Sequence, residues 1–135
     1  GLADIADRVA AVRSFALLPQ AAALAAANKR IANLLNKAPR AVEARVDAKL
    51  LEEPAETALA ALLAQVQPRA DAQFQRGDYT QSLQTLASLK EPVDAFFDSV
   101  MVNADDPLLR ANRLGLLKLL HAAMNRVADL SKLAA

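Results

Sequence analysis

The sequence has no cysteine, little glycine and few aromatic residues, and each shortage excludes a class of protein. Without cysteine, these 135 residues can form no disulfide, no thiolate zinc site and no cysteine nucleophile. With only 3 glycines and 4% aromatic residues, the chain lacks the composition of a β-sandwich or barrel. No apolar run approaches the roughly 18 residues that a transmembrane helix requires, so we expect no membrane partner. An intracellular location is compatible with these shortages.

Catalytic motifs are also missing. The chain has neither a glycine-rich phosphate-binding loop nor a nucleophile elbow. Its single histidine, His121, is expected on the polar side of a helix. The acidic residues between Glu43 and Glu56 are expected to form a solvated face and not a metal site. We therefore predict no catalytic residue, no metal site and no cofactor in this chain.

Alanine and leucine dominate a composition that is 54% hydrophobic, and both favour helices. Apolar residues recur at three- and four-residue spacing, which is the period of an amphipathic helix. Prolines and capping residues mark the boundaries. Asp78 is expected to cap the helix that follows it, with Gln81 three residues on as in a capping box, and Pro68 is expected to break or kink one helix. The pattern predicts an all-α, antiparallel bundle of about six helices, forming a single domain over residues 1–135. The expected helices are residues 2–17, 20–37, 54–76, 78–89, 91–100 and 107–132.

Charge is unevenly distributed in the second predicted helix, although the net charge is only +1. From Asn28 to Arg40 every charged residue is basic. At 100° per residue, Lys29, Asn33 and Lys37 lie on one stripe with Arg40, opposite the apolar face. Ammonium and guanidinium groups can contact phosphates, and asparagine amides can hydrogen-bond base edges. The stripe indicates an RNA-binding surface; the alternative is an ordinary solvated helix face.

Arg113 falls near the apolar stripe of the last predicted helix. A buried charge is normally paired, and Asp94 and Asp98, one turn apart on the preceding helix, are the expected partners. The alternative is a direct contact with RNA. The neighbouring Asn112 is expected to cap or brace a nearby loop.

A family resemblance is carried by three segments: AAANKRIANLLNKA (25–38), LKEPVDAFFDSVMVNADD (89–106) and LRANRLGLLKLLHAAMNRVADLSKL (109–133). The run EPVDAFFDSVMV followed by ANRL is the most specific part. These segments resemble the C-terminal anticodon-binding domain of bacterial glycyl-tRNA synthetase β subunits. That family belongs to the DALR-type anticodon-binding domains, which also occur in arginyl-tRNA synthetases. The tetrapeptide DALR itself is absent here, and Gly115 is an unusual residue inside a long helix.

The resemblance implies a helical bundle that recognises the anticodon region of tRNA(Gly). It implies a fragment of a longer β subunit, whose partners are the rest of that subunit and the α subunit of a cytoplasmic α2β2 enzyme, with two subunits of each kind. Glycine, ATP and tRNA would react elsewhere in that enzyme, so this domain would itself be non-catalytic.

The resemblance also suggests roles for particular residues. Asn28, Lys29, Arg30 and Asn33 match the family's basic helix, and with Lys37 and Arg40 they are the RNA-binding candidates. Asn112 and Arg113 match its last-helix motif and are expected to be mainly structural. Two alternatives stay open: a helical protein-interaction bundle with a basic face, and the related domain of an arginyl-tRNA synthetase.

Overall fold

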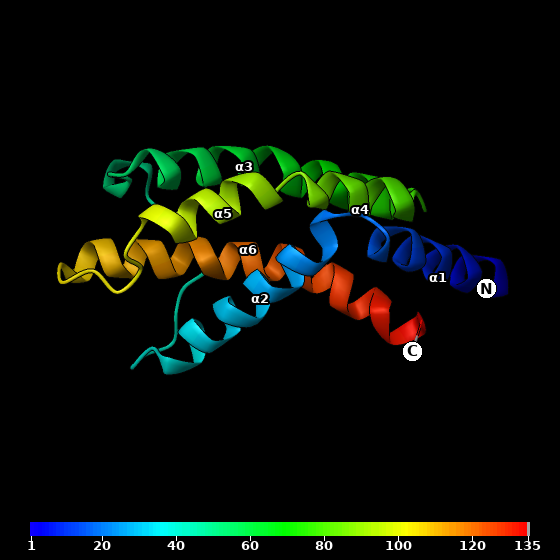
Figure 1. The fold of residues 1–135 in the computed structure, drawn as a ribbon, viewed down its shortest axis with the longest axis horizontal. Coiled ribbons are helices and arrows are strands. Elements are labelled where there is room, and N and C mark those ends of the chain that lie inside the picture. Colours follow the sequence, from blue (N-terminus) through cyan, green and yellow to red (C-terminus); the bar gives the residue numbers. More distant parts are fainter. Residues whose placement is uncertain (135) are drawn as a thin grey trace.

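The computed structural model describes residues 1–134, with the side chains of residues 1–127, and the regular structure of this part is entirely helical (Figure 1). The predicted all-α class and the division into six α-helices are confirmed. A 3-10 turn, η1, lies in the long connection after the second helix. The elements are α1 (Leu2–Ala16), α2 (Gln20–Lys37), η1 (Ala48–Leu50), α3 (Pro54–Gln75), α4 (Tyr79–Ala87), α5 (Lys90–Ser99) and α6 (Pro107–Ala134).

The long helix α6 runs through the middle of the bundle (Figure 1). On one side of it α3 runs along the molecule, and α4 and α5 return antiparallel to α3. On the other side α2 crosses α6, and α1 packs against both α4 and α6. α2 also contacts α5, so one of its faces packs against the bundle, and the opposite face is left to solvent.

Helix boundaries follow local chemistry. The capping box at the start of α3 joins Glu53 and Glu56, which satisfies backbone N–H groups that the first turn leaves unpaired. The backbone N–H of Leu108 donates to Asp106 Oδ1 at 2.8 Å and caps α6. The turn after α3 ends at Gly77, whose φ of 84° falls in the left-handed region that favours glycine.

Two local features differ from the predictions. Of the predicted break or kink at Pro68, the break is wrong, because α3 continues from Pro54 to Gln75. Pro68 and Ala64 are exposed, so water can satisfy the carbonyl that loses its partner, and buried residues on both sides of Pro68 hold the helix in place. Asp78 does not cap α4 with its side chain, because that carboxylate accepts from Arg76 Nε at 3.4 Å.

The described helices share one apolar core. Its fully buried large side chains come from α2 to α6, including Leu89 between α4 and α5. They are Leu24, Ile31, Leu59, Leu83, Leu86, Leu89, Phe96, Leu116, Leu117 and Leu120. Among the described residues no single helix is long and apolar enough to cross a bilayer, and the only pair that passes jointly, α1 with α2, is bent by 95°.

Candidate nucleic-acid interface

Burial of one face of α2 orients the basic stripe. Leu24 and Ile31 are 2% and 1% exposed against the bundle. Lys29, Asn33 and Lys37 lie on the other side of the helix and are exposed. The amphipathic reading of this helix is therefore confirmed, and its polar groups project into solvent.

The two lysines of this stripe have no counter-charge among the described residues. Neither Lys29 nor Lys37 forms an ion pair with any acidic side chain in the described part of the chain. Side chains four residues apart on a helix lie about 6 Å apart along its axis. The stripe thus presents two free ammonium groups with the Asn33 amide between them, a geometry suited to an RNA backbone and one base edge.

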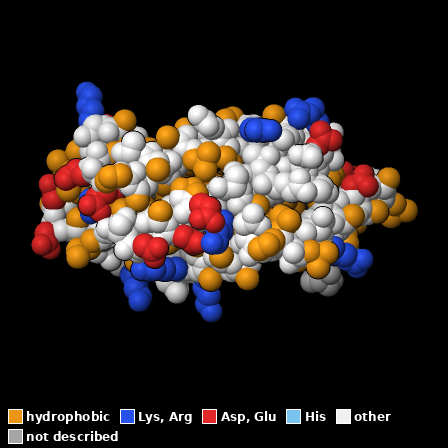
Figure 2. Space-filling model, turned by 45° about the horizontal axis from the view of Figure 1, so that its top comes forward, with side chains coloured by type: hydrophobic (Ala, Val, Ile, Leu, Met, Phe, Trp, Pro, Cys, Tyr) orange, Lys and Arg blue, Asp and Glu red, His pale blue; other side chains and the backbone are white. Residues whose placement is uncertain are grey.

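The other surface of the bundle differs. The face over α3, α4 and α5 carries acidic and basic side chains next to each other (Figure 2). On α5, for example, Lys90 pairs with Asp94 at 2.8 Å, and this bond holds the pKa of Lys90 above its ordinary value. A surface of mixed sign has little net attraction for a polyanion, so α2 is the better candidate.

Arg30 lies at the edge of the stripe and is already engaged. Its guanidinium carbon sits 4.3 Å from the centroid of the Phe97 ring on α5, a cation–π contact. Phe97 in turn meets the buried Phe96 edge to face, with the centroids 5.4 Å apart. The ring holds the guanidinium in one orientation, and the residue is still exposed enough for a base to stack on it.

Asn28 is separated from the stripe. It stands five residues before Asn33, about 140° around the helix, and so turns toward the side of Leu24. It is half-buried, and its Oδ1 is buried without a hydrogen-bond partner among the described residues. The structure therefore does not bring Asn28 together with the other RNA-binding candidates.

Arg40 is not on α2 at all. The helix ends at Lys37, and Ala38 is extended because Pro39 follows it. Arg40 is the third residue of a long segment, residues 38–53, here called the connection, which crosses α6 on its way to α3. Between the connection and the start of α6 lies a groove of about 870 Å³, and Arg40 is part of its lining.

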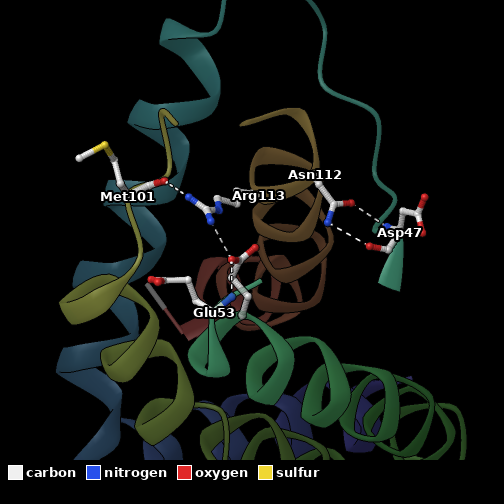
Figure 3. A network of polar contacts seen from close by, with 6 residues as sticks. Asp47, Glu53, Met101, Asn112 and Arg113 are labelled. Carbon is white, nitrogen blue, oxygen red and sulfur yellow. Dashed lines mark hydrogen bonds and ion pairs between the residues drawn. The ribbon is translucent and has the colours of Figure 1, made fainter. Parts of the chain in front are cut away.

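Arg113 is paired inside the bundle, as predicted, but not with the expected partner. Its Nη2 lies 2.9 Å from Glu56 Oε1, and its Nη1 donates to the Met101 carbonyl at 2.7 Å (Figure 3). The side chains of Arg113 and Glu56 are 8% and 0% exposed. Asp94 is occupied by Lys90 on its own helix, and Asp98 is exposed.

Glu56 is the site residue that the sequence prediction placed wrongly. It was grouped with acids expected to form a solvated face, yet it is fully buried. Its Oε1 also accepts the backbone N–H of Glu53 at 3.1 Å, closing the capping box of α3. The spacing of Glu53 and Glu56, with Pro54 at the first helical position, is the capping signal that could have singled out Glu56.

Asn112 braces the connection, as expected of it. Its Oδ1 accepts the Asp47 backbone N–H at 2.6 Å, and its Nδ2 donates to the Asp47 carbonyl at 3.1 Å (Figure 3). Gly115, one turn along α6, lets the connection approach closely: a Cβ there would overlap the Arg45 carbonyl oxygen and lie 3.1 Å from that of Glu43. The helix-weakening glycine thus has a packing reason.

Together, these features define an all-helical binding domain with one basic helix face and, within the described residues, no cluster of three metal-ligating side chains. The chain belongs to the DALR anticodon binding domain family, whose pattern matches residues 24–133.

Similar sequences extend this assignment. The chain is 71% identical over 134 residues to the glycine–tRNA ligase beta subunit of Leptothrix cholodnii, and 66% identical over 134 residues to that of Dechloromonas aromatica. Each alignment covers 99% of this chain but only 19% of the relative. The chain therefore spans about a fifth of the length of these curated relatives.

Proposed function

We propose that this chain is the anticodon-binding part of the β subunit of a cytoplasmic glycyl-tRNA synthetase, and that the outward face of α2 binds the anticodon arm of tRNA(Gly). The observation that carries the proposal is the pair of free lysines flanking Asn33 on a helix whose opposite face is buried. Similarity to glycine–tRNA ligase beta subunits supports the choice of tRNA over a protein partner.

Each side chain has a distinct part in this proposal. Lys29 and Lys37 contact phosphates, which supplies affinity without sequence preference. The Asn33 amide hydrogen-bonds a base edge, and the Arg30 guanidinium, held by Phe97, offers a plane on which a base can stack. Glycine, ATP and the acceptor end of tRNA react in other parts of the enzyme, contributed by the α subunit and the rest of the β subunit. This chain adds affinity and specificity, and it uses no cofactor of its own.

Lys29→Ala and Lys37→Ala test the phosphate contacts. Each removes one contact, so each should weaken binding to every RNA and reduce the slope of log affinity against log salt by about 0.7. Arg69→Ala is the control, since Arg69 is exposed on α3, on the other side of α6. The assay is titration of tRNA(Gly) and an unrelated RNA over a salt series. Equal affinity for both RNAs by the unchanged protein would favour the protein-interaction alternative.

Asn33→Ala tests base reading. Loss of the Asn33 amide should reduce the free-energy difference between binding of tRNA(Gly) and of an anticodon variant by roughly 1–3 kcal/mol, by analogy with direct readout on DNA. The measurement is charging of both tRNAs by the complete synthetase, with Asn103→Ala in the exposed loop before α6 as control. If the lysine and asparagine variants leave salt slope and discrimination intact, the RNA face lies elsewhere. The Arg110, Lys118, His121 and Asn125 side of α6 is then the next candidate.

A further inference from the structure

The basic stripe leads to the groove between the connection and the start of α6. Lys37 ends α2, and Arg40 follows three residues later at the groove. Along one side the lining residues belong to the connection, and along the other they belong to the first two turns of α6. An RNA strand that runs along the basic stripe toward the C-terminal end of α2 would therefore reach the groove next.

The walls of this groove are held in place without a ligand. Asn112 binds both backbone groups of Asp47, and the connection lies directly on Gly115. On the α6 side, Arg110 Nη1 donates to the Ala104 carbonyl at 2.9 Å and ties the preceding loop to the helix. A preformed site lowers the ordering cost of binding.

The lining combines apolar surface with positive charge at the edge. Val42, Leu50 and Leu114 contribute apolar surface, and Leu108 at the start of α6 is 64% exposed. Arg40 forms no ion pair with another described residue, whereas Arg45 lies 3.9 Å from Glu43, with both side chains largely exposed. Exposed pairs of that kind are weak, so Arg45 can leave Glu43 to bind a phosphate. Arg40 has no ion pair to break.

The connection also offers unused backbone groups. The N–H groups of residues 40–44 donate no hydrogen bond to any other described residue. Backbone donors and acceptors on a fixed wall can pair with the edge of a base. An unstacked base offers a flat apolar face together with such an edge, and it is covalently linked to a phosphate.

We propose that this groove accepts one unpaired nucleotide of the bound RNA loop, with its base against Val42 and Leu108 and its phosphate at Arg40 and Arg45. The proposal rests on the proposed function, because the stripe on α2 brings the loop to the groove. It assigns the sequence-reading pocket to the connection, in addition to Asn33 on α2.

Ala111→Trp tests the groove. Ala111 is exposed on α6 and part of the lining, so an indole there occupies the space of a base without disturbing the core. The matched control is Ala64→Trp, an exposed alanine on α3 on the other side of α6. The probe is a hairpin with the tRNA(Gly) anticodon loop, carrying 2-aminopurine at one loop position at a time, and a blunt duplex of the same stem serves as the loop-free RNA. Melting curves followed by circular dichroism establish that both variants fold.

The expected result has three parts. On the unchanged protein, one loop position shows a fluorescence change that Ala111→Trp abolishes. Ala111→Trp weakens binding of the hairpin about tenfold and leaves duplex binding unchanged, and Ala64→Trp alters neither. If Ala111→Trp binds the hairpin as tightly as the unchanged protein while Lys29→Ala weakens both RNAs, the groove proposal is overturned and the proposed function stands. If the unchanged protein binds neither RNA, both fail.

Discussion

Replacing Arg113 should lower the free energy of unfolding, and the size of the loss depends on how deeply the Arg113–Glu56 ion pair is buried. If the Arg113–Glu56 pair were exposed, its loss would cost at most about 1 kcal/mol. With side chains 8% and 0% exposed, Arg113→Ala instead leaves the Glu56 carboxylate buried without a counter-charge and the Met101 carbonyl without its donor. Breaking a buried pair from one side costs about 3 kcal/mol or more, which would lower the Tm by roughly 10 °C.

The assay is urea unfolding followed by circular dichroism, with Arg13→Ala on the exposed face of α1 as control. A second variant, Glu56→Leu with Arg113→Met, separates the cost of an orphaned charge from the value of the pair. Glu56 Oε2 and Arg113 Nε have no partner among the described residues, so the ionic pair is incompletely satisfied. The double variant should therefore be much more stable than Arg113→Ala. A loss below about 1 kcal/mol for Arg113→Ala would refute this reasoning, and unchanged stability with lost tRNA binding would make Arg113 an RNA contact.

Three further predictions concern how the helices and the connection are held. Gly115→Ala should lower the free energy of unfolding by about 1–3 kcal/mol, despite the better helix propensity of alanine, because the added methyl group would overlap the Arg45 carbonyl. Urea unfolding measures this loss, and a stabilised variant would contradict the close approach of the connection. Asn112→Ala should speed proteolytic cleavage of the connection near Arg45, with little change in far-ultraviolet circular dichroism, since it frees both Asp47 backbone groups. The Tyr79 hydroxyl donates to the Asp4 carboxylate beside Arg8 and, chiefly through this bond, holds the pKa of Asp4 below its ordinary value. Such a group stabilises the fold above its unfolded pKa, and this contribution is lost as pH falls through the lower folded pKa. Asp4→Asn should therefore flatten the decline of Tm below about pH 4, and Asp7→Asn, at an exposed position of the same helix, is the control variant.

Local pattern determined most of the helical architecture. Alanine and leucine at helical spacing, with prolines 19, 39, 54, 92 and 107 near the boundaries, predicted every α-helix to within a few residues. The outward direction of Lys29, Asn33 and Lys37 was also predictable, because 100° per residue separates them from Leu24 and Ile31 whatever the partner helix is. The same rotation could have shown that Asn28 turns away from the stripe.

Contacts between distant segments required the tertiary structure. Glu56 and Arg113 are 57 positions apart and Asp47 and Asn112 are 65 apart, and no helical period relates such positions. From the local sequence, Arg113 was predicted to pair with acidic residues of the preceding helix, and Glu56 was predicted to be exposed to solvent. Which acid meets Arg113 depends on how α3 and α6 pack, and the groove exists only because the connection is pressed onto α6 at Gly115. Helix formation depends on neighbours in the chain, whereas a buried partner or a pocket depends on which faces pack together, and that is a property of the whole bundle.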